Sequence, residues 1–107
     1  MLYMPDYSVN FVEQAKQFTS ELDAIAYAKV MKSATLFYRY GGNLGYPHSK
    51  KIHVNLFELR IPGHPAVRLF YTVKQQTVII FYGFYKKTNK LPRKELQMAL
   101  KLLASLG

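Results

Sequence analysis

Three stretches in the second half of the chain have the patterns of β-strands, and only short turns separate them. The stretches are residues 54–61, 66–73 and 77–83, and the turns are residues 62–65 and 74–76. The first two stretches alternate between the two faces of a strand, and turns this short join antiparallel neighbours. The third is apolar on both faces, so we expect it to be central or covered on both sides. The pattern therefore predicts an antiparallel sheet.

The alternation also predicts which side chains share a face of that sheet. One face of the first two strands is apolar and carries Phe57, Leu59, Ile61, Val67, Leu69, Tyr71 and Val73. The other face carries Leu56, Glu58, Arg60, Arg68, Phe70 and Thr72. Because Arg60 and Arg68 come from adjacent strands, they could lie side by side on this second face.

Helical patterns stand before and after the predicted sheet. We expect one helix to start at Thr19 or Ser20, either of which can cap it, to run to about Tyr40 and to stop at Gly41-Gly42. Its core-facing stripe is predicted to be Leu22, Ile25, Ala26, Val30, Phe37 and Tyr40. A closing helix is predicted over residues 91–106, with Pro92 at its first position and Gly107 after its end.

The other segments have weaker patterns. The pattern of residues 11–18 predicts one or two helical turns. Residues 8–12 are predicted to form either a short edge strand or the lead into that helix. Residues 42–51 are predicted to form a loop. Helices, then three or four antiparallel strands, then a helix make up an α+β fold. A chain of 107 residues has the usual size of one domain, so we expect residues 1–107 to form a single domain.

The chain is strongly basic, with a formal net charge of +9. Such a charge favours a polyanionic partner, which we expect to be nucleic acid, with an anionic membrane surface or an acidic protein as alternatives. The absence of cysteine excludes a disulfide framework and a thiolate metal site. The first residues lack a basic region followed by an apolar one, and no apolar run is long enough to span a bilayer, so we expect neither a signal peptide nor a membrane segment.

Carboxylates are scarce in this sequence. The six are Asp6, Glu13, Glu21, Asp23, Glu58 and Glu95. No two have the spacing of a hydrolase pair, and a two-metal nuclease would need several to converge. His48 and His53 are not at a zinc spacing with any third ligand. We therefore expect no metal site and no cofactor.

The groups that could carry chemistry are cationic. Arg60 and Arg68 come from the strands, and Lys86 and Lys87 follow the third strand. RNA has its own nucleophile, the 2′-hydroxyl, so its cleavage needs only a base, an acid and neutralisation of the developing charge. Arginine can hold a phosphate through two hydrogen bonds, and Tyr85 could stack on a base. The same cluster could also bind phosphate without cleaving it, or be a solvated surface.

Four short motifs, in order and at matching separations, resemble the RelE/HigB-type toxins of bacterial toxin–antitoxin modules. They are Glu58-Leu59-Arg60, then Val67-Arg68-Leu69-Phe70-Tyr71, then Gly83-Phe84-Tyr85-Lys86-Lys87-Thr88-Asn89-Lys90-Leu91-Pro92, then Glu95 and Ala99. The closest similarity is to the phage-derived HigB-like branch, and it covers about residues 44–103. The resemblance implies a RelE/ParE-like fold, with two N-terminal helices packed on a small antiparallel sheet and a C-terminal helix.

The resemblance also implies roles for particular residues. Arg68 matches the strand arginine that contacts the scissile phosphate, Arg60 matches the arginine of the E-L-R motif, and Lys86 or Lys87 matches the basic residue that assists the leaving group. Further candidate RNA contacts are His48, Lys50, Lys51, His53, Tyr85 and Lys90. RelE itself has a lysine base where this sequence has Glu58. The base is therefore open among His48, His53, Lys50, Lys51 and Glu58.

The function implied by this resemblance is that of a type II toxin. Such a protein is a ribosome-dependent, metal-independent endoribonuclease that cuts mRNA and inhibits translation, and a cognate antitoxin holds it inactive. We accordingly expect mRNA on the ribosome and an antitoxin as partners, no membrane association and a cytoplasmic location. Alternatives are a ParE-like gyrase inhibitor that cleaves no RNA and a basic module that binds nucleic acid or protein.

Overall fold

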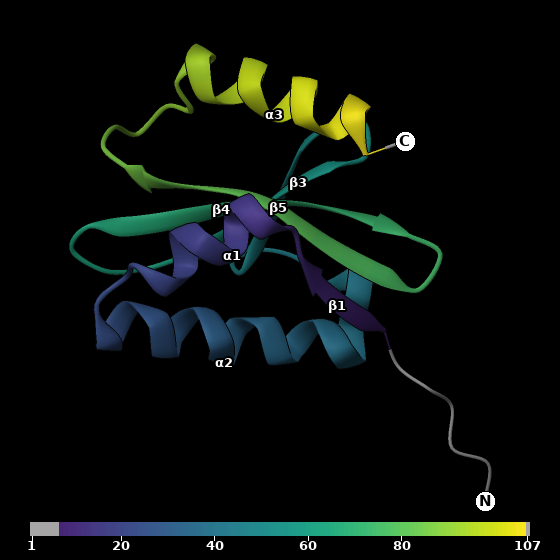
Figure 1. Cartoon of the computed structure of the whole chain (residues 1–107), viewed down its shortest axis with the longest axis horizontal. Helices are drawn as coiled ribbons and strands as arrows, with labels where there is room; N and C mark the ends of the chain where they lie inside the picture. The colour runs from purple at the N-terminus through teal and green to yellow at the C-terminus, as the bar shows by residue number, and fades with distance from the viewer. Residues whose placement is uncertain (1–6, 107) are drawn as a thin grey trace, which may run out of the picture.

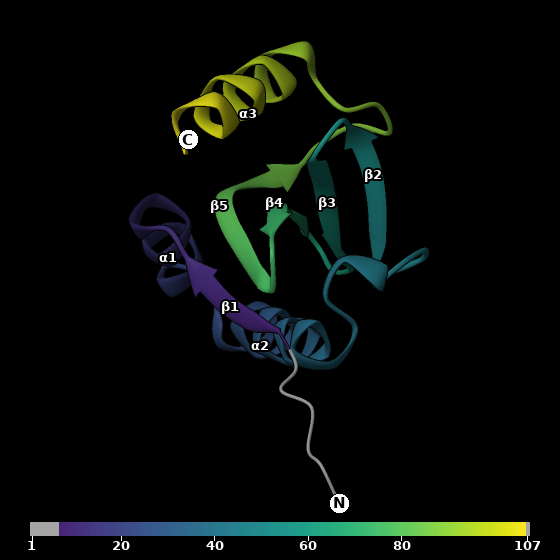
Figure 2. The same ribbon diagram turned by 90° about the vertical axis from the view of Figure 1, so that its right-hand side faces the viewer.

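The computed structural model describes residues 7–106, which form a sheet with helices on both faces (Figures 1 and 2). Helices α1 and α2 lie on one face and α3 on the other, which confirms the predicted α+β class. The elements in chain order are β1 (Ser8–Phe11), α1 (Glu13–Ser20), α2 (Ala24–Tyr40), the 3₁₀ turn η1 (Gly41–Asn43), β2 (Ser49–His53), β3 (Leu56–Ile61), β4 (Ala66–Lys74), β5 (Thr77–Lys86) and α3 (Arg93–Ser105).

The sheet has five strands in the order β1-β5-β4-β3-β2. The three predicted strands, β3, β4 and β5, pair antiparallel as expected. The prediction of a wholly antiparallel sheet is wrong, because β1 pairs parallel to β5, with Ser8 opposite Thr77. The short edge strand predicted over residues 8–12 is β1, and β5 is central as predicted, since it lies between β1 and β4.

One face of the sheet forms the larger core, against α1 and α2. The alternation predicted this face correctly, since Leu59, Ile61, Val67, Leu69 and Tyr71 are all buried in it with Val30 and Phe37 of α2. Gly83 allows α1 to approach β5 here, because a Cβ at this position would collide with the Phe18 ring and with Leu69. The sequence-derived assignment of strand faces is therefore confirmed for the part of the chain that forms this core.

The opposite face is covered by α3 alone. Leu56, Phe70, Phe81, Phe84 and Ala99 form a second, smaller core there, with partly buried leucines of α3 around it. The Tyr82 hydroxyl donates a hydrogen bond to Glu95 Oε1 at 2.7 Å and so links β5 to the first turn of α3. Because α3 covers only part of this face, the polar residues of β2, β3 and β4 are left beside it.

The helix boundaries differ from the predictions in ways that local contacts explain. Asp23, rather than Thr19 or Ser20, caps α2, and its side chain accepts a hydrogen bond from the Ala26 N–H at 2.8 Å. Thr19 is instead buried, and its hydroxyl donates to the carbonyl of Ala15. The predicted stop is confirmed, since α2 ends at Tyr40 and Gly41 follows with a φ of 51°.

Two members of the predicted α2 stripe do not face the core. Ile25 is 72 % exposed and Tyr40 is 46 % exposed, and they lie in the first and the last turn of α2. In α3, Pro92 precedes the helix as its N-cap residue rather than occupying its first position. Gly107, predicted to follow the end of this helix, lies outside the described residues.

The loop predicted over residues 42–51 is shorter than expected, because β2 starts at Ser49. This strand is an edge strand with mostly exposed side chains, so it lacks the apolar alternation that identified the others. The Ser49 hydroxyl shares a buried hydrogen bond with the Tyr71 hydroxyl, which attaches the start of β2 to the larger core.

Candidate functional site

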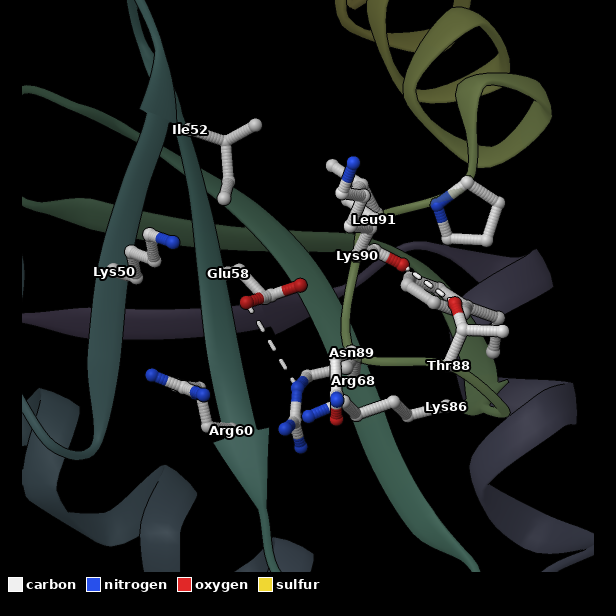
Figure 3. A pocket seen from close by; sticks show the side chains of 12 residues that line it. Lys50, Ile52, Glu58, Arg60, Arg68, Lys86, Thr88, Asn89, Lys90 and Leu91 are labelled. Carbon is white, nitrogen blue, oxygen red and sulfur yellow. Dashed lines mark hydrogen bonds and ion pairs between the residues drawn. The ribbon is translucent and has the colours of Figure 1, made fainter.

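A small hollow opens on the face of the sheet that α3 only partly covers (Figure 3). Strands β2, β3, β4 and β5 form its floor, and the connection from β5 to α3 forms its wall. Five lysine or arginine side chains and one carboxylate line it, so we name it the basic hollow. Its lining residues are Lys50, Ile52, Glu58, Arg60, Arg68, Phe84, Lys86, Thr88, Asn89, Lys90, Leu91 and Pro92.

The strand register brings the charged residues together. Arg60 of β3 lies directly opposite Arg68 of β4, and Lys50 of β2 lies directly opposite Glu58 of β3. Lys86 follows two residues after Phe84, which is itself opposite Arg68, so it shares their face of the sheet. The predicted juxtaposition of Arg60 and Arg68 is therefore confirmed.

Glu58 and Arg68 form an ion pair at the bottom of the hollow. Arg68 Nε lies 3.8 Å from Glu58 Oε1, and the two side chains are 8 % and 9 % exposed. The Arg68 guanidinium also donates to the carbonyl of Val67 at 3.1 Å. Burial lowers the pKa of Arg68, Glu58 opposes this by favouring the charged form, and the neighbouring Arg60 lowers that pKa further. Arg68 is therefore a desolvated cation with one negative neighbour.

Arg60 turns away from Arg68, as Figure 3 shows. Its guanidinium carbon lies 5.5 Å from the centre of the Tyr46 ring, in the geometry of a cation–π interaction. Like charges directly opposite each other on a sheet repel. The two arginines are thus separated by their different partners. The basic hollow as a whole has five cationic side chains and one carboxylate, and this excess of positive charge favours an anion.

The connection after β5 contributes the exposed part of the hollow. Thr88, Asn89 and Lys90 are exposed residues of this turn. The Thr88 hydroxyl donates to the carbonyl of Lys90 at 2.7 Å, which fixes the local bend. The junction between the last strand and the last helix thereby places side-chain and backbone polar groups next to the cations of the sheet.

The structure brings half of the sequence-predicted site residues into the basic hollow. Arg60, Arg68, Lys86, Lys50 and Lys90 line it. The others that were predicted do not: they are Lys87, His48, Lys51, His53 and Tyr85. Lys51 and Tyr85 do not line the hollow because they lie on the other face of the sheet. Lys51 pairs with Phe57 and Tyr85 with Val67, and both partners face the larger core.

Four of these five residues have different settings. The Tyr85 ring packs against Phe18 of α1 at 5.3 Å between ring centres. His48 lines a separate hollow with Leu36 and Tyr40. His53 is an exposed residue at the end of β2, and Lys87 is exposed just after β5.

Three residues at or beside the hollow were not among the predicted site residues: Tyr46, Thr88 and Asn89. Thr88 and Asn89 lie inside the lysine-rich motif that follows β5, so their position could have been inferred from the motif. Tyr46 lies in Leu44-Gly45-Tyr46-Pro47, which also resembles the loop after the second helix of RelE/HigB-type toxins. Its contact with Arg60 could not be inferred from that resemblance, because it depends on the path of the loop before β2.

Within residues 7–106, no three histidine, cysteine, aspartate or glutamate side chains are grouped so that they could hold a metal ion. None of the helices over these residues is long and apolar enough to cross a membrane.

Comparison with protein-family models gives a match to "Phage derived protein Gp49-like (DUF891)" over residues 17–104. The matched region includes every residue that lines the basic hollow. Comparison with curated proteins gives no match.

Proposed function

Because the chain belongs to the family of phage-derived Gp49-like proteins, we propose that it is the toxin of a type II toxin–antitoxin module. The family is associated with RelE-like and other toxin-like proteins, which supports the toxin assignment. In this proposal the protein is a RelE/HigB-type endoribonuclease that cuts mRNA on the ribosome and so inhibits translation. A cognate antitoxin protein is its second partner.

The observation that carries the nuclease proposal is the composition of the basic hollow. Its five cations surround a single carboxylate, Glu58, and its volume is about 60 Å³. A hollow of this size suits a phosphate group better than a whole nucleotide. Arg60 and Arg68 would hold the scissile phosphate between them, where their charges neutralise the negative charge that develops in the transition state.

Glu58 is the group that we assign as the base. Of the five candidates left open by the sequence, only Glu58 and Lys50 line the hollow. An ionised carboxylate accepts hydrogen bonds and protons, whereas a protonated lysine has only donors. In the proposed step the 2′-oxygen attacks phosphorus and gives its proton to Glu58, while the bond from phosphorus to the 5′-oxygen breaks. The nucleophile belongs to the RNA, so this chemistry requires no metal ion.

Lys86 is the group that we assign to the leaving oxygen. It lies on the same face of the sheet as Arg68 and lines the hollow, so its ammonium group could donate a proton to the departing 5′-oxygen. Lys87 is its neighbour in the chain but does not line the hollow. The two lysines, which the resemblance did not distinguish, therefore provide a matched test of the site.

We expect Lys86→Ala to lower mRNA cleavage about 100-fold or more, since it removes an acid and a transition-state charge. Lys87→Ala should lower it by less than about tenfold, because it removes only one charge from the general basic surface. Cleavage of a defined transcript in a translation reaction and growth after induction in cells would measure both. Lys32→Ala, on the exposed side of α2, is the control for loss of one charge. Equal losses for Lys86→Ala and Lys87→Ala would contradict the assigned site.

A further inference from the structure

Tyr46 combines high exposure with a fixed position at the border of the basic hollow. It is 79 % exposed, more than any other large hydrophobic side chain in the described part of the chain. Its ring nevertheless has a defined partner, the Arg60 guanidinium at 5.5 Å from the ring centre. We propose that Tyr46 is a nucleobase-binding residue, on which a base of single-stranded RNA stacks next to the phosphate in the basic hollow. This inference rests on the proposed function in that it takes RNA as the ligand.

The cation–π contact makes Tyr46 suitable for stacking. The guanidinium of Arg60 lies over one face of the ring, and Tyr46 is nevertheless 79 % exposed. A base on the opposite face would complete a stack of guanidinium, phenol ring and base. The contact also links base stacking on Tyr46 to phosphate binding in the basic hollow, because Arg60 is one of the two arginines that would hold the phosphate.

The surroundings of Tyr46 extend from the basic hollow around the edge strand β2 to the other face of the sheet. A second hollow of about 340 Å³ is lined by Tyr46 together with Asn43, Lys50, Lys51 and Phe57. Lys50 lines both hollows, so an RNA strand that follows the cations from the first to the second stays in contact with positive charge. Asn43 adds an amide that can hydrogen-bond to the edge of a base.

Three other exposed tyrosines are placed differently, while a fourth, Tyr40, lines a hollow together with Tyr46 and His48. Tyr85, which the sequence suggested for stacking, has its ring against Phe18 on the opposite face of the sheet. Tyr27 and Tyr38 belong to α2, which covers that same opposite face (Figure 2). Among these exposed rings, Tyr46 is the one in contact with a residue of the basic hollow.

Fluorescence of a Tyr46→Trp variant tests stacking directly. The chain contains no tryptophan, so the introduced indole would be the only one. The probes are a single-stranded RNA of eight nucleotides with a non-cleavable 2′-O-methyl backbone, and the same backbone with abasic sites throughout. We expect the first probe to quench the indole and the second to leave its emission unchanged, although both bind through their phosphates. Equal quenching by both probes, or none by either, would overturn the proposal.

Affinities measured by anisotropy of a labelled strand provide the second readout. Base stacking on an aromatic ring contributes about 1–3 kcal/mol, so Tyr46→Leu should weaken binding of the base-carrying probe roughly tenfold. It should leave binding of the abasic probe unchanged, and Tyr46→Phe should bind both probes like the wild type. Tyr38→Leu, at a tyrosine of α2 that is 48 % exposed, is the matched control. Equal weakening for both probes would mean that Tyr46 only positions Arg60, which would contradict a base contact.

These experiments test base stacking independently of the proposed nuclease function. The probes are not cleavable, so stacking can be present in a protein that cuts no RNA. Conversely, a protein that cuts mRNA while Tyr46→Leu binds both probes like the wild type would retain the proposed function and lose this inference.

Discussion

At the residue scale, the site holds two like charges next to each other, and each of them has a partner of its own. Arg60 and Arg68 are directly opposite each other on neighbouring strands. Arg68 pairs with Glu58, and Arg60 lies over Tyr46. Removing Arg68 would leave Glu58 buried without a counter-charge, which destabilises a protein. Glu58→Gln likewise leaves the buried Arg68 without its counter-charge, so the free energy of unfolding of either variant has to be measured beside its activity.

We expect Glu58→Gln to lower mRNA cleavage about 100-fold or more, because the amide cannot accept the proton of the 2′-hydroxyl. Binding of a non-cleavable RNA should be kept or become tighter, since one negative charge leaves a phosphate site. Lys50→Ala should show the reverse pattern, with weaker binding and a smaller loss of rate. Single-turnover cleavage and RNA affinity, measured on the same preparations, separate the two effects. Full activity of Glu58→Gln would place the base elsewhere.

At the element scale, the placement of α3 decides how much of the sheet remains open. Besides apolar packing, α3 is held by the hydrogen bond from Tyr82 to Glu95. Burial, then this hydrogen bond and the charge of Glu95, raise the pKa of Tyr82 to about 12. The fold thus favours the neutral phenol over the phenolate.

The raised pKa predicts how stability depends on pH. The neutral form of Tyr82 stabilises the fold fully below the unfolded pKa of about 10, and this contribution is lost as the pH rises towards 12. Tyr82→Phe should lower the free energy of unfolding by about 1 kcal/mol at pH 7, and its stability should fall less than that of the wild type between pH 10 and 12. Urea unfolding followed by circular dichroism measures both, with Tyr27→Phe as the control. Parallel losses for wild type and variant would contradict this role of Tyr82.

The elements also show what the sequence could predict. Strands β3 and β4 alternate cleanly, so their faces, and hence the shared face of Arg60 and Arg68, followed from parity alone. The edge strand β2 was missed because its exposed lysines hide any alternation. The parallel pairing of β1 with β5 could not be predicted, because no local turn connects the two strands.

The site residues also divide into those whose positions the sequence could predict and those whose positions it could not. Lys86 lines the hollow and Lys87 does not. The sequence could not tell the two lysines apart, because that requires the register of β5. This register shifts between Phe70 and Tyr71 of β4. The contact between Tyr46 and Arg60 depends on a loop whose path has no periodic pattern. Resemblance to a family supplied the order of the motifs, while the structure supplied the directions in which their side chains point.

At the scale of the whole molecule, the net charge of +9 should make RNA binding depend strongly on salt. The logarithm of the affinity for single-stranded RNA should fall by about 0.7 per contacted phosphate for each tenfold rise in salt. Lys90→Ala should lower this slope by about 0.7, because Lys90 lines the hollow. Lys101→Ala, on an exposed position of α3, should change it less. Equal slopes for the wild type and Lys90→Ala would remove Lys90 from the interface.

The measurement that tests the central claim most directly is transcript cleavage in a purified translation reaction, mapped by primer extension with and without ribosomes. The account predicts cuts within the coding region only when ribosomes are translating, and their loss with Glu58→Gln and Lys86→Ala. Metal independence needs a separate test, because ribosomes themselves require magnesium. Cuts without ribosomes would identify a free ribonuclease. Intact transcripts from a folded preparation that still arrests growth would contradict the account and turn attention to gyrase.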